Sequence, residues 1–550
     1  MRNAPELVEV DSTRLEEVLR RVEQSLDEED SALVRAVFES YAYVADLVED
    51  KNTSIRRLRQ LFFGARTETT EAVVGQKTRK PDAAVPRDAL AETDLAAGDG
   101  NSNESDAAAA SKGHGRNGAE AYRGAARIDV PHPSLTAGDA CPACGQGTVY
   151  EKAPGVLVRI TGQPPLAATI YELQKLRCHL CGQVFTAAAP EEAGERKYDA
   201  TAGSMIGLLK YGSGLPFNRL DGLQGDLEVP LPASTQWDIV QAVAADLAPA
   251  FAELIRQAAQ GEVLHNDDTT VKILELMGER GRQEAMAGAA GDVIDSEERR
   301  GLYTSGVVAL RDGHRVALFF SGRRHAGENL AQVLEHRAEQ LPPPIQMCDA
   351  LSRNLPGELR TILAHCLAHA RRRFVDVYDR FPEPCRHLLE SLAVVYHNDA
   401  VARERRLSPE ARLQFHQEAS RPTMEDLHDW LTRQLEEKRT EPNSALGGAI
   451  GYMLKHWDRL TLFLHQVGAP LDNNVCERAL KKAILHRKNA LFYKTRNGAR
   501  VGDLFMSLIY SCQLNQANPF DYLTQLQRHA EALAVCPQFW MPWNYREAMA

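Results

Sequence analysis

The stretch TSGVVALRDGHRVALFF at 304–320 decides the fold of the second half of the chain. Two apolar runs within it, at 304–310 and 314–320, have the composition of buried β-strands. The residues between them, Arg-Asp-Gly at 311–313, are typical of a tight turn. The stretch therefore predicts an antiparallel β-hairpin.

Further strands flank this hairpin. A short apolar run at 262–267 predicts a strand before it, and a helix near 326–338 leads to another strand that ends at Asp349. Strands that are joined first by a hairpin and then by a helix predict a mixed sheet. The segment at 375–468 has helical patterns and little strand signal, so we expect an all-α insertion there.

Three acidic residues occupy different local settings in this predicted core. Asp267 and Asp349 end short apolar runs, where the chain leaves a buried strand, and Glu477 lies in the first turn of an amphipathic helix. The polar residues at 472–474 are expected to cap that helix. Carboxylates from two strand ends and one helix suit Mg²⁺ or Mn²⁺, and hence phosphodiester chemistry.

These motifs carry a resemblance to a known family. The stretches that carry it are IRRLRQLFFGARTE at 55–68, HNDDT at 265–269, QMCDALSRN at 346–354, HCLAHARRRF at 365–374, LDNNVCERALKKAILHRKNALF at 471–492 and GARVGDLFMSLIYSCQLNQANPFDYL at 498–523. On these stretches the chain resembles bacterial transposases of the insertion sequence 66 family over nearly its whole length.

The resemblance implies a DNA transposase with an Asp-Asp-Glu core of ribonuclease-H-like fold. Asp267, Asp349 and Glu477 match its catalytic residues and would hold two Mg²⁺ or Mn²⁺ ions roughly 3.5–4 Å apart, with Asp267 bridging them. Such a site cuts a strand at the end of the element and then drives the freed 3′-hydroxyl into target DNA. The implied partners are the terminal inverted repeats, target DNA and small companion proteins encoded by the same element.

The first motif departs from the usual family pattern. That pattern has glutamate after the first aspartate and proline after the threonine, whereas this chain has Asp268 and Thr270 at those positions. Because successive strand residues face opposite ways, only one of Asp267 and Asp268 can readily face the metals, and the family pattern favours Asp267. We expect Asp268 to have a supporting role.

Cys366 and His369 stand three residues apart and would share one face of a helix. They resemble a Cys-x-x-His signature that follows the second aspartate in several Asp-Asp-Glu transposases, which implies that they support the active site. An isolated pair of this kind is more often ordinary core, and a zinc site would need two further ligands.

Basic residues follow the predicted glutamate. From Arg478 to Arg500 there are eight Lys or Arg and no acid, although the whole chain has a net charge of −11. The absence of acids favours a track for DNA phosphates over a solvated helix face. The candidate DNA-binding residues, including those of a second cluster, are Arg371, Arg372, Arg373, Arg478, Lys481, Lys482, Arg487 and Lys488.

Four cysteines form two Cys-x-x-Cys pairs, a spacing at which both thiolates of a pair can bind one Zn²⁺ from the same side. Together they fill a tetrahedral structural site, and apolar runs within 155–175 predict the strands of a zinc ribbon around it. Recognition of DNA ends is the expected use of this module. The four ligands are Cys141, Cys144, Cys178 and Cys181.

The segments on either side of the predicted zinc ribbon have distinct patterns. Between 33 and 62 apolar residues recur at alternating steps of four and three, which is coiled-coil spacing and favours self-association, as a homodimer or a higher oligomer, over packing within one chain. The helical region at 199–260 resembles a helix-turn-helix, which would put Thr235, Gln236 and Trp237 at a DNA groove. Alternatively, it packs the zinc module against the core, and the residues favour neither interpretation.

These features predict a multidomain α+β protein. No apolar run reaches the roughly 18 residues that span a bilayer, and the acidic start MRNAPELVEVDS lacks the features of a signal peptide, so we expect a cytoplasmic location. The predicted regions are an N-terminal coiled-coil region at 1–66, a flexible low-complexity linker at 67–130, a zinc ribbon at 131–198, the helix-turn-helix-like region at 199–260, the first part of the ribonuclease-H-like core at 261–374, the all-α insertion at 375–468 and the second part of the core, with the Glu477 helix, at 469–550.

Two other classes of protein remain open. A ribonuclease-H-like DNA nuclease without strand transfer would share the three acids. A catalytically silent DNA-binding protein would need only the zinc ribbon. The intact acids favour an active enzyme, and the joining of DNA ends distinguishes a transposase from a nuclease.

Overall fold

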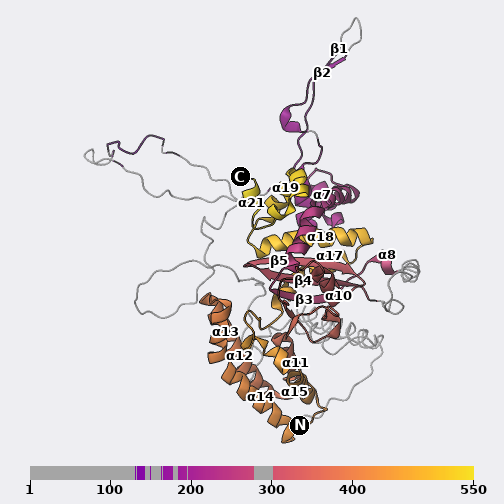
Figure 1. The fold of residues 1–550 in the computed structure, drawn as a ribbon. Coiled ribbons are helices and arrows are strands. Elements are labelled where there is room, and N and C mark those ends of the chain that lie inside the picture. Colours follow the sequence, from indigo (N-terminus) through magenta and orange to yellow (C-terminus); the bar gives the residue numbers. More distant parts are fainter. Residues whose placement is uncertain are drawn as a thin grey trace, which may run out of the picture. The chain divides into compact units, whose positions relative to one another are not determined.

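The computed structural model describes two long stretches of the chain and several short ones (Figure 1). The predicted coiled coil, the linker and the four zinc cysteines lie outside the described residues. The chain divides into two compact units, of which one comprises 244–549 with 211–214 and the other contains 215–243 and the described residues up to 210. The described residues are 131, 133–140, 142, 149, 163, 165–177, 184–194, 196–277 and 301–549.

A five-stranded mixed sheet forms the centre of the larger unit, as the order of strands and helices in the sequence predicts. The first three strands in chain order pair antiparallel, and the last two run parallel to the first. In sheet order the strands are β5 (His314–Gly322), β4 (Tyr303–Arg311), β3 (Val263–Thr270), β6 (Ile345–Cys348) and β7 (Ile362–His365).

The β4–β5 hairpin turns where the sequence predicts. Arg311 pairs with His314, and the two residues between them, Asp312 and Gly313, have φ angles of 48° and 78°. Positive φ at both central residues is the geometry of a two-residue hairpin turn whose twist matches that of the strands. The predicted strand at 262–267 is too short, because β3 keeps its pairing with β4 as far as Thr270.

Helices cover both faces of the sheet (Figure 1). On one face lie α17 (Asn474–Ala490) and α18 (Arg496–Leu514), and on the other lies α10 (Ala326–Leu334). The helix predicted near 326–338 therefore ends four residues early. Among the helices of the described residues, none is both long and apolar enough to cross a bilayer.

α18 closes the outer edge of the sheet with polar side chains. Edge strands expose unpaired backbone N–H groups, which are templates for pairing with other chains. Here alternate N–H groups of β5 donate to side chains spaced four residues apart on α18. The pairs are Ala317 with Ser511 (3.0 Å), Phe319 with Ser507 (3.0 Å) and Ser321 with Asp503 (2.7 Å).

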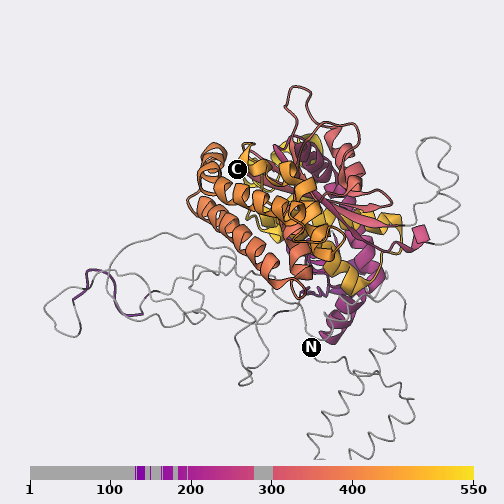
Figure 2. The ribbon, with the colours of Figure 1, turned by 90° about the horizontal axis from the view of Figure 1, so that it is seen from below.

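A layer of helices lies beyond the β6–β7 side of the sheet, and residues 375–468 contain no strand. One apolar core extends from Ile345 and Met347 on β6 through Phe374 to Leu388 and Leu427 in this layer. Figure 2 shows its long helices side by side. The elements are α11 (Leu367–Val377), α12 (Pro382–Glu404), α13 (Pro409–Ala419), α14 (Arg421–Glu436), α15 (Ala445–Lys455), α16 (Trp457–Leu460) and η6 (Leu462–Leu464).

The chain after α18 is helical as well. Pro519, a residue suited to the first helical turn, begins the next helix, and the Asn518 side chain caps it through the N–H of Phe520 at 2.9 Å. The elements are α19 (Pro519–Arg528), α20 (Ala530–Val535), η7 (Pro537–Phe539) and α21 (Tyr545–Ala548).

The smaller unit contains a short antiparallel strand pair on either side of 178–183, the segment of the sequence that includes two of the four predicted zinc ligands. The run TIYEL at 169–173 is not a strand, because pairing begins at Lys175. The elements are β1 (Lys175–Arg177), β2 (Val184–Thr186), η3 (Glu191–Ala193), α5 (Ala200–Gly207), the π-turn η4 (Leu208–Gly212), α6 (Phe217–Asp226) and the long α7 (Ala233–Ala259), of which η4 and α7 continue into the larger unit.

Gln236 does not fit the helix-turn-helix hypothesis. Its side chain is fully buried and donates hydrogen bonds to the carbonyl oxygens of Phe217 (3.1 Å) and Leu231 (2.8 Å). A side chain held in this way cannot reach a DNA groove. Gln236 therefore cannot serve at a groove as the helix-turn-helix interpretation supposes, and its side chain instead joins the start of α6 to the segment just before α7.

Candidate active site

Asp267 lies on β3 at a point where a helix approaches the sheet closely. Its partner on β4 is Gly306. A Cβ atom on Gly306 would lie 3.1 Å from Leu480 and 3.3 Å from Cys476, both on α17, and Cys476 Sγ donates to the Gly306 carbonyl at 3.3 Å. The missing side chain of Gly306 thus lets α17 lie against the strand that carries Asp267.

Glu477 lies in the first turn of α17, as predicted, and of the three polar residues at 472–474 it is Asp472 that accepts from the N–H at the helix start. Asn473 occupies the cap position without capping the helix, since its fully buried amide donates to the Asn266 carbonyl (3.1 Å) and lies 3.1 Å from His265 Nδ1. The Asn474 N–H instead bonds to Asp472 at 3.1 Å. Asn473 therefore ties the Glu477 helix to β3.

Asp349 directly follows β6, the parallel neighbour of β3. Its Oδ1 accepts hydrogen bonds from the N–H of Leu351 (3.2 Å) and from the side chain of Asn354. The Asn354 carbonyl in turn accepts from the side chain of Asn266 on β3, at 2.8 Å. These bonds fix the Asp349 carboxylate relative to the strand that carries Asp267.

The three predicted acids converge electrostatically. Burial, together with the negative charges of Asp349, Asp268 and Glu477, raises the pKa of Asp267 to about 7, although a hydrogen bond from the Asp268 N–H at 2.8 Å opposes the rise. Like charges that are this close disfavour ionisation of one another. Three carboxylates therefore act on the charge of Asp267, and the groups that shift its pKa include no cation.

Asp268 faces the other side of the sheet from Asp267. Its side chain is 2% exposed, and its oxygens lie 2.9 Å from His325 Nδ1 and 3.6 Å from an Arg353 nitrogen. His325 precedes α10, where its N–H bonds to Glu328 at 2.8 Å. The sequence shows the helix-capping pattern of His325 and Glu328. It does not show that the His325 side chain contacts Asp268, 57 positions earlier.

The predicted Cys366 and His369 lie beside Glu477. Cys366 is the buried residue that precedes α11, and its sulfur accepts a hydrogen bond from the Asn473 N–H at 3.2 Å. His369 Nε2 lies 3.6 Å from Glu477 Oε1. One ligand atom from each of the three residues can lie within 4.8 Å of the other two.

The predicted basic residues on α17 differ in their surroundings. Arg478, Lys481 and Lys488 are exposed. Lys482 is half-buried, with its nitrogen 5.8 Å from the centre of the Tyr510 ring. The three exposed residues place positive charge on the helix that carries Glu477.

Arg487 has a structural partner that the sequence does not reveal. Its guanidinium donates to the hydroxyl groups of Thr269 (3.2 Å) and Thr270 (2.6 Å) at the end of β3. It therefore links α17 to the strand of Asp267, in addition to any contact with DNA.

The second basic cluster lies on α11. Arg373 is exposed and stacks on Tyr452, with 3.8 Å between the guanidinium carbon and the ring centre. Arg371 and Arg372 are half-buried on the same helix. This cluster begins two residues after His369.

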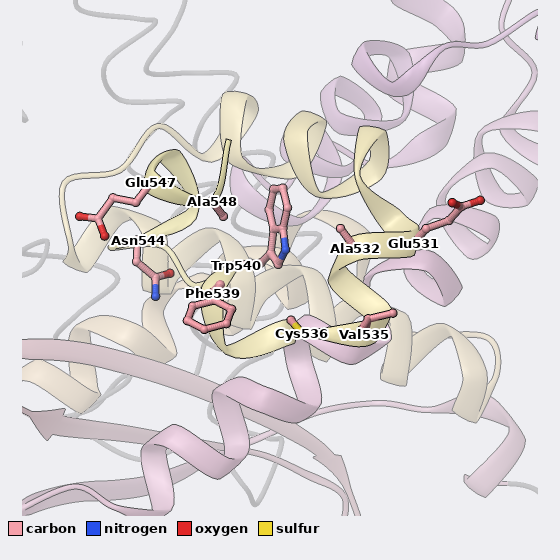
Figure 3. Close-up of a pocket in the computed structure, with 9 residues that line it drawn as sticks. All are labelled: Glu531, Ala532, Val535, Cys536, Phe539, Trp540, Asn544, Glu547 and Ala548. Atoms are coloured by element: carbon pink, nitrogen blue, oxygen red, sulfur yellow. The ribbon is translucent and has the colours of Figure 1, made fainter. Parts of the chain in front are cut away.

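A separate pocket of about 620 Å³ lies in the C-terminal helices (Figure 3). Val535, Phe539 and Trp540 give it an apolar wall, whereas Glu531 and Glu547 lie at opposite ends and point away from each other. No group of carboxylates converges there, so this pocket does not offer the chemistry of the Asp267 region.

Comparison with known proteins identifies the family. The model of the family described as "Transposase IS66 family" matches residues 197–501. Three uncharacterized proteins of Sinorhizobium fredii are also similar: y4hP is 27% identical over 74% of this chain and 74% of its own length, y4jD is 35% identical over 34% and 36%, and y4qI is 25% identical over 62% and 61%. The family match covers more than half of the chain, which therefore belongs to the IS66 family of transposases.

Proposed function

We propose that this transposase cleaves the ends of its insertion sequence and joins them to target DNA at Asp267, Asp349 and Glu477. The observation that carries the proposal is that Asp349, at the end of one strand, and Glu477, on a helix, add their charges to the burial that raises the pKa of Asp267 on a neighbouring strand. The mixed sheet, with three antiparallel and two parallel strands, fits a ribonuclease-H-like core.

The donor set fits hard divalent cations. Carboxylate oxygens are the ligands that Mg²⁺ and Mn²⁺ prefer, and the mutual repulsion of the acids is what a divalent cation would relieve. Asp267, Asp349 and Glu477 would hold two such ions. When bound, the ions would make the attacking hydroxyl easier to deprotonate and would stabilise the negative charge that forms on the leaving oxygen.

The surrounding residues orient the acids and the DNA. Asn473 fixes the start of the Glu477 helix, and His325 holds the Asp268 carboxylate on the other side of the sheet from Asp267. The exposed cations Arg478 and Lys481 would bind backbone phosphates next to Glu477. Positioning and charge neutralisation of this kind dominate phosphodiester chemistry.

The proposal extends to regions that the structure does not describe. The four cysteines of the predicted zinc ribbon would bind one structural Zn²⁺ and recognise DNA ends. The segment at 33–62 would form a homodimer, and companion proteins from the same element would assist in the cytoplasm. Sedimentation of a fragment that ends near residue 64 tests the dimer.

DNA that carries the inverted repeats flanking the gene tests the proposed activity. With Mg²⁺, the full chain is expected to nick these ends and to join them to target DNA. Asp267→Ala, Asp349→Ala and Glu477→Ala should each abolish cleavage and keep end binding. The matched control is Asp429→Asn, which changes an acid on α14 that is 77% exposed, and it should retain cleavage.

Each other outcome corresponds to an alternative. Nicking without joining would identify a nuclease of the same fold. End binding without nicking would identify a silent DNA-binding protein. Cleavage that survives all three alanine substitutions would place the active site elsewhere.

A further inference from the structure

We propose that Cys366, His369 and Glu477 form a second metal site, which takes a borderline transition-metal cation such as Zn²⁺ and withdraws Glu477 from the other acids. The sulfur, nitrogen and oxygen that these residues offer lie within 4.8 Å of one another. Cys366 and His369 alone are too few ligands, but the fold adds a third from a position 108 residues beyond His369 in the sequence. The site itself does not depend on the proposed transposase chemistry.

The His369–Glu477 separation resembles that of two ligands of one ion. At 3.6 Å, Nε2 and Oε1 are too far apart for a hydrogen bond. Two ligands that each lie about 2.0–2.2 Å from a tetrahedral metal are separated by about this distance. His369 Nδ1 is buried and has no hydrogen-bond partner among the described residues, so the ring makes no hydrogen bond that would have to be broken when Nε2 binds a metal.

The three ligands are held by two helix starts that are bonded to each other. Cys366 immediately precedes α11, and Glu477 lies in the first turn of α17. The Leu367 N–H donates to the Leu471 carbonyl at 3.0 Å, and the Asn473 N–H donates to Cys366 Sγ at 3.2 Å. A backbone N–H on a ligand sulfur is the kind of secondary contact that orients metal ligands.

The chemistry of the ligands separates this site from the carboxylate cluster. Thiolate and imidazole favour Zn²⁺ and similar cations, whereas Mg²⁺ prefers oxygen ligands. Three protein ligands leave a fourth position open for water or another small ligand. Because Glu477 belongs to both groups, a cation bound to Cys366 and His369 opposes the use of Glu477 beside Asp267.

Metal binding is tested directly on the full chain after treatment with a chelator. Titration with Zn²⁺, and separately with Co²⁺ as a spectroscopic probe, compares the wild type with Cys366→Ser and His369→Ala. The wild type should bind one equivalent more than either variant, and Co²⁺ should show the thiolate band of one additional sulfur. The predicted four-cysteine site contributes equally to all three proteins.

Cys536→Ser is the matched control, because Cys536 is a free, half-exposed cysteine after α20. It should keep the additional equivalent. Since Cys366 is buried and its variant can misfold, His369→Ala, at a side chain that is 28% exposed, is the second test. Equal stoichiometry and equal cobalt spectra in the wild type and the folded His369→Ala variant overturn the proposal.

Competition for Glu477 has its own test, which rests on the proposed function. Zn²⁺ added to a Mg²⁺-dependent cleavage reaction should inhibit the wild type, and His369→Ala should need at least tenfold more Zn²⁺ for the same fractional inhibition. Zn²⁺ binding without any inhibition overturns the sharing of Glu477. Absence of cleavage under all conditions counts against the proposed function. The Zn²⁺ and Co²⁺ titrations still decide whether Cys366, His369 and Glu477 bind a metal.

Discussion

Asp267 and Asp503 both have a pKa that burial raises to about 7, yet they lie in regions of opposite character. Asp503 on α18 accepts hydrogen bonds from the N–H and the hydroxyl of Ser321, both at 2.7 Å. Asp267 accepts one hydrogen bond, from the Asp268 N–H, and the charges of Asp349, Asp268 and Glu477 add to the effect of burial on its pKa. The same shift in pKa therefore belongs to a hydrogen-bonded acid of the fold at Asp503 and to an acid that a cation could stabilise at Asp267.

The difference shows how to distinguish a structural acid from a functional one. On β5, the edge strand that α18 covers, each of three N–H groups donates to a polar side chain of α18. These side chains therefore stabilise the fold. The carboxylate cluster gathers like charges, which destabilises the folded chain unless a cation binds. Acids whose mutual repulsion destabilises the fold are candidates for function. A raised pKa alone does not make an acid such a candidate.

Asp267→Asn is expected to have the largest effect of the substitutions that test this comparison. DNA cleavage should fall by at least about 10³-fold, because a metal ligand and a charge are lost. In chelator at pH 8 the melting temperature should rise, since the like-charge repulsion at this position is removed. Cleavage assays and thermal unfolding of the same preparations measure both effects.

The opposite pattern would break the comparison. If Asp267→Asn melts at a lower temperature in chelator and Asp503→Asn at a higher one, then Asp267 is the structural acid. Addition of Mn²⁺ sharpens the test, because it should raise the melting temperature of the wild type more than that of Asp267→Asn.

Gly306→Ala is expected to have the next largest effect. The added Cβ would meet Leu480 at 3.1 Å and Cys476 at 3.3 Å, and α17 would have to shift by a few tenths of an ångström beside Asp267. A misplaced Glu477 should lower cleavage by about 10–10²-fold. Gly322→Ala is the control, since a Cβ on Gly322 meets nothing within 4 Å and should leave cleavage unchanged.

Ser507→Ala tests the closed edge of the sheet. It leaves the buried Phe319 N–H without its acceptor and should lower the free energy of unfolding by about 1–2 kcal/mol, with little effect on metal binding. Ser391→Ala is the matched control, because Ser391 makes the same hydroxyl bond to the carbonyl four residues earlier but accepts from no strand. Equal losses in chemical denaturation would show that the strand contact contributes nothing.

Much of the central sheet could be predicted because local patterns encode it. The apolar runs and the Arg-Asp-Gly turn predict β4 and β5, and the ends of apolar runs mark Asp267 and Asp349. The continuation of β3 to Thr270 could not be predicted, because the residues after Asp267 are polar and only pairing with β4 keeps them extended.

The partners around the candidate site could not be predicted because they come from distant parts of the chain. Asn473 has the composition of a helix cap, but its amide bonds to β3 more than 200 positions away. Asp503, Ser507 and Ser511 have helical spacing in the sequence, but their role depends on which strand forms the edge. Sequence thus shows which groups can bond, and topology decides what they bond to.

Asp503→Asn is expected to have the smallest effect, which appears as a dependence on pH. Because the folded-state pKa lies above the ordinary value of 3.8, the contribution of Asp503 to stability is complete below about pH 4 and declines as the pH rises to about 7. Asparagine keeps an acceptor for the Ser321 N–H but carries no charge. Relative to the wild type, the variant should be about equally stable at pH 4 and more stable by about 1 kcal/mol at pH 8.

Chemical denaturation at several pH values measures this difference, and Asp429→Asn, at an exposed acid, should show no such trend. A variant that is less stable than the wild type at pH 8 would mean that the Ser321 bonds to the ionised carboxylate outweigh its burial. In that case the comparison becomes sharper, because Asp503, with two hydrogen bonds from Ser321, would tolerate a buried charge, whereas Asp267, with one hydrogen bond, would not.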